Sequence, residues 1–199
     1  MAASRTRRGT RAAETAERKR RLLDAATALA AEGGYDAVQM RDVAARAEVA
    51  LGTLYRHYAS KDQLLLAALA QQAGALRERL DQRPPRGDTP GERVADVLRR
   101  ASRALERQPR VMQAMLAAMS AGDESTASVK HEINTTLRAI IADAADGERA
   151  PGLDDARIDE VVPVLGAVWF AELTFWSGGF SDARSMADAL ARAARLLLP

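Results

Sequence analysis

Apolar residues recur at helical spacing along almost the whole chain. After a basic N-terminal run, positions 22, 23, 26, 29 and 30 are all Leu or Ala, which places an apolar stripe on one helix. Gly33 and Gly34 end this helix, since glycine is favoured where a helix terminates. Two short helices are predicted next, over 40–47 and 51–58. No segment alternates apolar and polar residues with a period of two, so the sequence predicts an all-α protein.

A long helix begins after the two short ones. Ser60 is a favourable N-cap, and Gln63 stands three residues later, which is the spacing of a capping box. The segment "PPRGDTPG" (84–91) is incompatible with a helix and marks the clearest joint in the chain. Beyond it the pattern predicts helices over 91–107, 110–121, 123–145, 154–177 and 182–198, with breaks at Pro109, Gly122, "DGERAPG" and "SGGFS".

The helices before residue 60 have the dimensions of a helix-turn-helix, because two of them are short and only a brief turn joins them. In such a motif the first helix and the start of the fourth pack behind the short pair, which frees the last short helix to enter a major groove. The predicted organisation is a basic flexible arm (1–17), an N-terminal three-helix helix-turn-helix DNA-binding domain (18–62) and a larger C-terminal helical domain (63–199).

The stretch "LGTLYRHYASK" (51–61) carries the chemistry for binding DNA. Its cations and neutral donors suit phosphate oxygens, its glycine lets the backbone approach a duplex, and its leucine suits a thymine methyl group. Leu54 and Tyr58 lie four residues apart and are expected to face the core, with Tyr58 half-buried. Within this stretch the predicted DNA-contacting residues are Leu51, Gly52, Thr53, Tyr55, Arg56, His57 and Lys61.

Charge is distributed unevenly along the chain. Residues 1–21 carry eight basic and two acidic groups, a local charge of +6, whereas the whole chain has a net charge of +2 and the remainder is therefore net acidic. A basic N-terminal segment on an otherwise acidic chain suggests that this segment binds a polyanion. The alternative is a basic tail that is simply solvated. The chain has no cysteine, no membrane-length apolar run and no secretory signal, so we expect a cytoplasmic protein with no membrane, metal or cofactor partner.

The C-terminal part is rich in apolar residues that suit a dimer. In "VVPVLGAVWFAELTFW" (161–176) only Glu172 is charged, and a helix that is apolar all round must be buried on several sides. We therefore predict a four-helix bundle formed by the last two helices of two copies. The alternative is that the stripe on the last helix belongs to the core of one chain. The predicted interface residues are Phe175, Trp176, Met186, Leu190, Ala194 and Leu197.

The same domain offers a candidate ligand site. Methionines on one face of "RVMQAMLAAMSAG" are adaptable enough to line a cavity for a bulky apolar molecule, although a methionine stripe is also typical of ordinary core. Glu172 is flanked by apolar residues and requires a partner, either a polar group of a ligand or Arg192 or Arg195. The predicted ligand-binding residues are Met112, Met115, Leu116, Met119, Leu165, Trp169 and Glu172.

Residues 18–69 resemble the DNA-binding domain of the tetracycline-repressor (TetR) family of bacterial regulators. The resemblance rests on the helix ending in "GGY", on "RDVAARA", and on "GTLYRHY" followed by a Ser-Lys pair. It implies DNA contacts from Gln39 and Arg41 as well as from the residues of 51–61 named above, a homodimer, and a small-molecule effector. Three positions depart from the family pattern: Gln39 replaces a capping threonine, Glu48 replaces a glycine in the turn, and Ala50-Leu51 replaces a small-polar and basic pair.

The stretch "GGYDAVQMRDVAARAEVALGTLYRHY" is also similar to the actinobacterial branch that represses sterol and lipid catabolism, which implies an effector of sterol or acyl-CoA type. The leading hypothesis is a dimeric repressor that binds a pseudo-palindromic operator and is released by a hydrophobic effector. An architectural DNA-binding protein without a ligand is the alternative, and it predicts a C-terminal core with no cavity. A small enzyme using Glu172 and His131 lacks a supporting constellation, because neither histidine has metal-ligand spacing.

Overall fold

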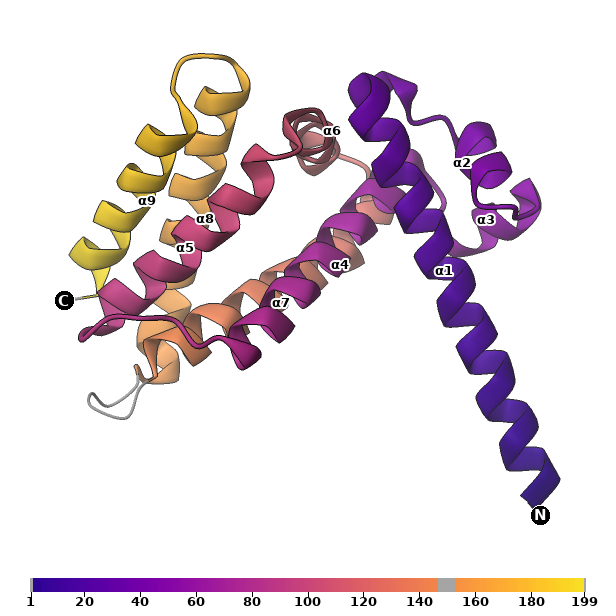
Figure 1. Cartoon of the computed structure of the whole chain (residues 1–199), viewed down its shortest axis with the longest axis horizontal. Coiled ribbons are helices and arrows are strands. Elements are labelled where there is room, and N and C mark those ends of the chain that lie inside the picture. The colour runs from indigo at the N-terminus through magenta and orange to yellow at the C-terminus, as the bar shows by residue number, and fades with distance from the viewer. Residues whose placement is uncertain (1, 147–152, 199) are drawn as a thin grey trace.

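The computed structural model of the chain describes residues 2–146 and 153–198, with side chains from Ala13 onward. In these residues every regular element is helical, so the predicted all-α class is confirmed (Figure 1). The elements are α1 (Ala2–Ala37), α2 (Met40–Arg46), α3 (Leu51–His57), α4 (Lys61–Gln82), α5 (Pro90–Glu106), α6 (Pro109–Ser120), the short 3-10 helix η1 (Glu124–Thr126), α7 (Ala127–Ala145), α8 (Asp155–Ser177) and α9 (Ala183–Leu197). The predicted break "DGERAPG" lies largely outside the described residues.

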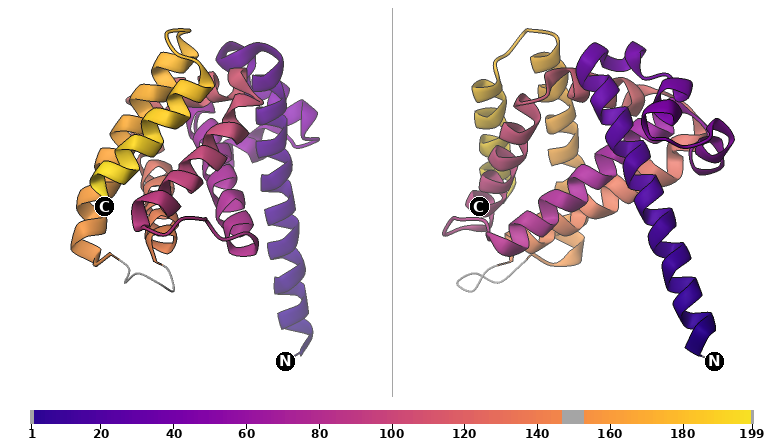
Figure 2. Two further views of the ribbon diagram at one scale, coloured as in Figure 1. Left: turned by 60° about the vertical axis from the view of Figure 1, so that its left-hand side comes forward. Right: turned by 45° about the vertical axis from the view of Figure 1, so that its right-hand side comes forward.

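The backbone of α1 departs from helical geometry where the sequence predicts its end. Gly33 has a φ of −141°, and Gly34 has a φ of +70°, in the region that favours glycine. At the other end, α1 begins at Ala2, so the backbone of the segment expected to be a flexible arm is helical from residue 2. The N-terminal half of α1 extends past α2 and α3 (Figures 1 and 2).

Helices α2 and α3 form the predicted helix-turn-helix against α1 and α4. Val43, Leu54 and Leu64 are fully buried, and Tyr58 keeps only 8% of its surface exposed, more buried than the half-buried ring predicted. The turn between the two helices contains Glu48 with a φ of +54°. This is the left-handed region, which explains why a glycine would suit this position and why a glutamate there carries backbone strain.

Half of the predicted capping box is present at the start of α4. The Ser60 hydroxyl accepts a hydrogen bond from the Gln63 backbone N–H at 3.2 Å, as predicted. The Gln63 side-chain oxygen accepts from the Ala59 N–H at 2.6 Å, one residue earlier than in the standard box. Both bonds fix the point at which α4 leaves the helix-turn-helix.

The C-terminal part packs α5 between α9 and α7, with α8 beside α9, at the end of the molecule remote from α2 and α3 (Figure 1). Helix α9 approaches the N-terminus of α5 so closely that a Cβ added at Gly91 would lie 2.1 Å from the Leu198 carbonyl oxygen. Buried Arg93 joins α5 to α7 by donating to the carbonyls of Ala144 (3.0 Å) and Ala145 (2.6 Å). Its charge lies at the C-terminal end of α7, where a cation is favourable.

The hydrophobic core is continuous from the helix-turn-helix into the C-terminal part. Helix α4 spans the predicted boundary at residue 62 and contacts α1 on one side and α6 and α7 on the other. Helix α6 also packs directly on α1. The two parts of the chain therefore share buried surface.

Candidate DNA-binding face and ligand cavity

The outer face of α3 carries most of the predicted DNA-contacting side chains. Leu51 and Tyr55 expose 38% and 51% of their surfaces, and Thr53 and His57 are partly buried. Leu54, on the opposite face, is fully buried. The helical period separates the two faces, since residues 51, 52, 55 and 56 lie on one side. The exposed residues of α3 are Leu51, Gly52, Tyr55 and Arg56.

Two of the predicted DNA-contacting side chains make local hydrogen bonds beside this face. Arg56 Nη2 donates to the Thr53 hydroxyl at 3.1 Å, which holds the guanidinium over the outer side of α3. Gln39 Nε2 donates to the Asp36 carbonyl at 2.8 Å and makes no capping bond to α2, in agreement with the predicted loss of a cap at this position. Arg41, in the first turn of α2, is exposed.

Lys61 is held by an aromatic ring. Its Nζ lies 3.7 Å from the centroid of the Tyr35 ring, a cation–π distance, and the side chain is partly buried. The Tyr35 hydroxyl donates to Asp62 Oδ1 at 2.6 Å. Burial, together with that carboxylate, raises the pKa of Tyr35 to about 12, so the hydroxyl stays protonated and keeps donating at neutral pH. The "GGY" segment and the Lys61-Asp62 pair thus lock the end of α1 to the start of α4.

Basic residues of α1 reach the end of α3, which the sequence did not reveal. Burial lowers the pKa of His57, and the nearby charges of Lys19, Arg56 and Arg18 lower it further. Arg18 and Lys19 therefore lie close enough to α3 to share its electrostatic surface. Their signal in the sequence was the basic run 18–21, which by itself gives a charge but no position.

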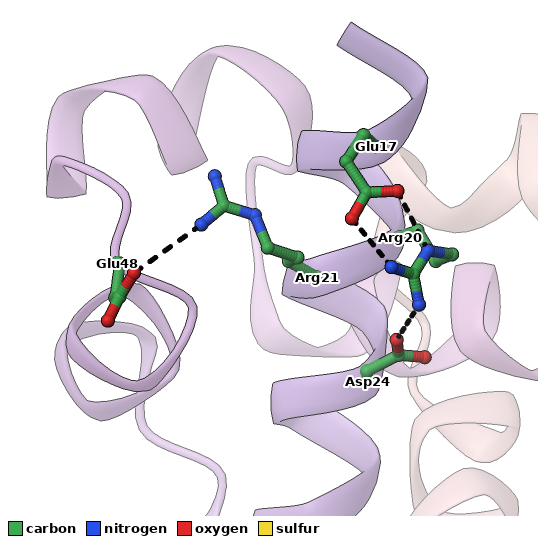
Figure 3. A network of polar contacts seen from close by, with 5 residues as sticks. All are labelled: Glu17, Arg20, Arg21, Asp24 and Glu48. Atoms are coloured by element: carbon green, nitrogen blue, oxygen red, sulfur yellow. Dashed lines mark hydrogen bonds and ion pairs between the residues drawn. The ribbon is translucent and has the colours of Figure 1, made fainter. Parts of the chain in front are cut away.

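The neighbouring arginines of that run are engaged in ion pairs (Figure 3). Arg20 Nη2 lies 2.6 Å from Glu17 Oε1, and Arg20 Nη1 lies 3.0 Å from Asp24 Oδ2. Arg21 Nη1 lies 3.8 Å from Oε2 of Glu48, which is in the turn between α2 and α3. Among the described residues, no ion pair of this kind engages Arg18 or Lys19. Of the basic run 18–21, the two residues outside these ion pairs are thus the ones whose charges act on His57.

A cavity of about 350 Å³ lies within the C-terminal part, between α4, α5, α6, α7 and α8. Met112 and Met115 are almost wholly buried and also line this cavity, so the methionine face of α6 serves both as core and as cavity wall. Of the predicted ligand-binding residues, the wall contains Met112, Met115, Leu116, Met119 and Trp169. A volume of this size is typical of sites for small organic molecules.

Two of the predicted ligand-binding residues lie away from the cavity wall. Helix α8 lines the cavity through Gly166, Trp169, Phe170 and Leu173, whereas Leu165 is buried elsewhere and Glu172 is partly exposed. The reason is rotation, because each helical position turns by about 100° and these two residues precede the cavity-facing ones by one position. Within the described part of this one chain, Glu172 forms no ion pair with Arg192 or Arg195, and a pairing across the bundle of two copies stays a prediction.

Helix α6 connects the cavity to α1, which packs against the helix-turn-helix. Its methionines line the cavity, and its first turn carries Arg110, whose Nη1 donates to the Glu32 carbonyl at the end of α1 at 2.6 Å. The segment after α6 makes a second connection, since the Ser60 hydroxyl donates to Asp123 Oδ2 at 2.8 Å. Hydrogen bonds from Ser125 and Ser60 lower the pKa of Asp123, which keeps this acceptor ionised.

The predicted dimer residues divide into two groups. Met186, Leu190 and Ala194 have no exposed surface, because α9 turns this stripe onto α5 of the same chain; their assignment to a dimer surface is corrected. Trp176 and Leu197 are partly buried, and Phe175 is 52% exposed. The apolar residues that α8, α9 and their connection leave open to solvent are Val164, Phe170, Phe175, Phe180 and Leu196.

Two further classes of site were sought in the described residues. They contain no cluster of three or more His, Cys, Asp or Glu side chains arranged to hold a metal ion. None of their helices combines the length and the apolar character needed to cross a bilayer.

Comparison with known proteins places both parts of the chain in one family. Residues 22–68 match the family described as "Bacterial regulatory proteins, tetR family". Residues 87–197, more than half of the chain, match the "Tetracyclin repressor-like, C-terminal domain". The first match contains α2 and α3, and the second contains most of the cavity wall.

Individual relatives agree with this assignment. The HTH-type transcriptional repressor KstR of Rhodococcus jostii is 39% identical over 184 residues, which cover 92% of this chain and 83% of the relative. A TetR transcriptional regulator from Rhodococcus sp. RHA1 has a similar structure, with a TM-score of 0.83, 30% identity and coverage of 92% and 97% of the two chains. Thermus thermophilus FadR, solved in complex with lauroyl-CoA, shares the fold at 19% identity and a TM-score of 0.69, over 90% of this chain and 92% of FadR. The chain therefore belongs to the TetR family of bacterial regulators and is a transcriptional repressor, with a helix-turn-helix for DNA and no enzymatic role.

Proposed function

We propose that the chain is a ligand-responsive repressor, which binds a pseudo-palindromic operator as a homodimer and leaves it when an apolar effector fills the cavity. The observation that carries this proposal is the double role of α6. Met112 and Met115 on this helix line the cavity, and Arg110 in its first turn holds the end of α1. A molecule that displaces α6 therefore acts on the support of the helix-turn-helix.

The DNA-contacting assignment is supported by exposure and charge. Leu51, Gly52, Tyr55 and Arg56 share the outer face of α3, and Arg18 and Lys19 lie beside it. Cations and neutral donors of this kind bind phosphates and set the register on the duplex, while Leu51 and Thr53 at the start of α3 are placed to meet base edges.

Dimerisation is supported by the apolar surface that α8 and α9 leave open. Val164, Phe175 and Leu196 are exposed on this end of the chain. Apolar surface concentrated in this way favours association with a second copy, since a closed two-fold assembly buries the same patch on both subunits. Two copies would carry two recognition helices, which read half-sites about 34–36 Å apart.

An effector of sterol or acyl-CoA type is supported by the apolar wall of the cavity and by FadR, whose solved complex contains lauroyl-CoA. For release, the effector must bind more tightly to the conformation in which the recognition helices are misplaced, because equal affinity for both states shifts nothing.

An electrophoretic shift with the protein's own promoter fragment tests DNA binding. Tyr55→Ala is expected to weaken binding roughly tenfold, since an exposed donor on the DNA face is lost. The matched control is His131→Ala, which alters an exposed residue on α7 and is expected to bind as the unmodified protein does. Equal affinity of the Tyr55 variant and the control would overturn the assignment of the α3 face.

The alternative, an architectural DNA-binding protein without a ligand, predicts a C-terminal core with no cavity. The cavity of about 350 Å³ favours the ligand-responsive function. Lauroyl-CoA added in thermal unfolding distinguishes the two, because a ligand that binds only the native state raises the melting temperature. A rise in the melting temperature together with release of promoter DNA from the protein supports the proposal. Release of the DNA without a change in the melting temperature would mean that lauroyl-CoA acts elsewhere than in the cavity.

A further inference from the structure

The side of α8 that the rest of the described chain leaves uncovered is apolar. Val164 and Phe175 are 46% and 52% exposed. Ala167 and Ala171 are exposed as well, and none of the four lines the cavity. Val164, Ala167 and Ala171 follow one another at intervals of three and four residues, which is the spacing of a seam along which two helices pair. Phe175 lies one turn further along the same side, and we call these four residues the outer face of α8.

The same helix forms part of the cavity wall, through Gly166, Trp169, Phe170 and Leu173. Leu173 is buried and Trp169 is partly buried, whereas Gly166 and Phe170 are exposed. Phe170 lies one turn from Gly166 and Leu173, which are on the wall, and it also lies one turn from Ala167, which is on the outer face. Phe170 therefore stands where the cavity wall meets the outer face of α8.

This edge of the wall is thinly built. Gly166 contributes only backbone, and a Cβ added to it would meet no atom of another helix within 4 Å. Phe170 is 40% exposed, so its neighbours do not hold the ring on every side. A side chain that keeps such freedom loses conformational entropy when a bound molecule packs against it. The described chain by itself therefore leaves the wall incomplete at Gly166 and Phe170.

The rest of the exposed wall has a different character. Outside α8 the exposed wall residues are Arg79, Ala104 and Gln108, and the side chains of two of them carry polar groups that water solvates. This part of the wall suits an opening to solvent. The edge at Gly166 and Phe170 offers water no polar side chain, and removal of its apolar surface from water is favourable. An apolar cover therefore fits this edge, and the adjoining outer face of α8 is the surface on which such a cover would rest.

We propose that a second copy of the chain, packed on the outer face of α8, also covers Gly166 and Phe170, so that the effector site is complete only in the dimer. The inference rests on the proposed function, which supplies both the homodimer and the role of the cavity. A second copy fits as the cover because a two-fold interface places the same apolar face on both subunits, and the seam spacing of the outer face suits a helix as the partner element. The effector and the partner subunit then hold Phe170 from two sides.

Completion of the site by the partner subunit links effector binding to dimerisation. A dimer that binds the effector more tightly than the monomer does is itself strengthened by the effector, by the same factor. Release of the operator then comes from misplaced recognition helices in an intact dimer, and not from dissociation of the two subunits.

Subunit exchange in the full chain tests this link. Unlabelled and ¹⁵N-labelled protein are mixed, and native mass spectrometry follows the appearance of mixed dimers with and without saturating Nile red, a neutral apolar dye whose fluorescence reports its own binding. We expect the bound dye to slow the exchange roughly fivefold or more, since couplings between two binding events commonly reach this size and act mainly on dissociation. Exchange that the bound dye leaves unchanged or accelerates would overturn the inference.

Two phenylalanines of α8 allow a matched pair of variants. Phe170→Ala removes the ring that stands between the wall and the outer face, and the dye is expected to slow its exchange by no more than about twofold. Phe175→Ala removes an exposed ring from the outer face but not from the wall. It is expected to exchange faster without the dye and still to be slowed by the dye as the unmodified protein is. Equal slowing in the two variants would show that the partner subunit does not cover Phe170.

The outcomes separate this inference from the proposed function. A monomeric unmodified protein would overturn the proposed homodimer, and failure of both Nile red and lauroyl-CoA to bind would overturn the proposed effector cavity. A dimer that binds the dye without any change in subunit exchange leaves both parts of the proposed function standing, and it overturns only the completion of the site by the partner subunit.

Discussion

Leu51 occupies the leading edge of α3 with 38% of its surface exposed, where the family pattern has a basic residue. An apolar side chain at this position makes no hydrogen bond to a base, and its available partner in a major groove is the methyl group of thymine. We therefore propose that Leu51, which departs from the family pattern, recognises A·T pairs by packing.

The Leu51 contact is testable with DNA that lacks thymine methyl groups. A promoter fragment amplified with deoxyuridine in place of thymidine is expected to bind the unmodified protein roughly threefold more weakly, since each buried methyl group contributes about 0.8 kcal/mol. Leu51→Ala is expected to bind the two fragments alike, as measured by fluorescence anisotropy. If replacing thymidine by deoxyuridine weakens binding equally in Leu51→Ala and in the unmodified protein, the methyl contact belongs to another residue.

We expect His57 to make DNA binding dependent on pH. Its pKa is lowered by burial and by Lys19, Arg56 and Arg18, so the free protein carries it uncharged at neutral pH. A DNA phosphate favours the charged form and raises this pKa, so the complex takes up a proton. The affinity gain is therefore complete below the pKa of His57 in the free protein, and it is lost as the pH rises through the pKa of the complex.

Between pH 6 and pH 8 we expect affinity for the promoter fragment to fall roughly threefold at constant ionic strength. His57→Gln is expected to remove this dependence, and His131→Gln, at the other histidine of the chain, is expected to retain it. If the affinity of His57→Gln for the promoter fragment depends on pH as that of the unmodified protein does, another group takes up the proton.

At the scale of the elements, the contact between α5 and α9 determines the C-terminal packing. Gly91 lies where the end of α9 approaches α5, and a Cβ at this position would lie 2.1 Å from the Leu198 carbonyl oxygen and 2.9 Å from the Arg195 Cα. These are backbone atoms, so relief requires displacement of a helix.

Gly91→Ala is therefore expected to reduce the free energy of unfolding by about 1–3 kcal/mol, the usual cost of overpacking. The matched control is Gly74→Ala inside α4, where an added Cβ meets no atom within 4 Å and the better helix former is expected to stabilise by about 0.5–1 kcal/mol. Urea denaturation followed by circular dichroism gives both values, and a Gly91 variant as stable as the unmodified protein would mean that α9 moves away at little cost.

Local sequence patterns predicted the elements well. The glycines that interrupt α1, the Ser60 cap and the two short helices follow from rules that operate within a few residues, so the chain near each position is sufficient. The same reasoning placed Leu54 inward and Tyr55 outward, because a helix of known start and period has fixed faces. Leu165 and Glu172 were misplaced, since the sequence of α8 is apolar on several faces and does not show which one borders the cavity.

At the scale of the whole molecule, exposed apolar residues lie at both ends, and the two ends are expected to serve different partners. Val164 on α8 and Leu51 on α3 are 46% and 38% exposed. We expect Val164→Asp to turn a dimer into a monomer in sedimentation velocity and to weaken operator binding, because an unpaired charge would be buried in the proposed interface. Leu51→Asp is the matched control: it places the same charge on the same class of residue and is expected to abolish DNA binding while the dimer persists. A monomeric unmodified protein, or a dimer unaffected by Val164→Asp, would contradict the proposed interface.

The sequence by itself determined the helical class, the helix-turn-helix, the outer face of α3 and the family, because these depend on local spacing and on short motifs. The tertiary structure alone decided which apolar stripe meets which neighbour. The Met186–Leu190–Ala194 stripe packs on α5 of its own chain, and Arg18 and Lys19 come to lie beside His57 nearly forty residues along. The physical reason is that hydrophobic burial is non-directional, so periodicity identifies an apolar face but the path of the chain selects its partner.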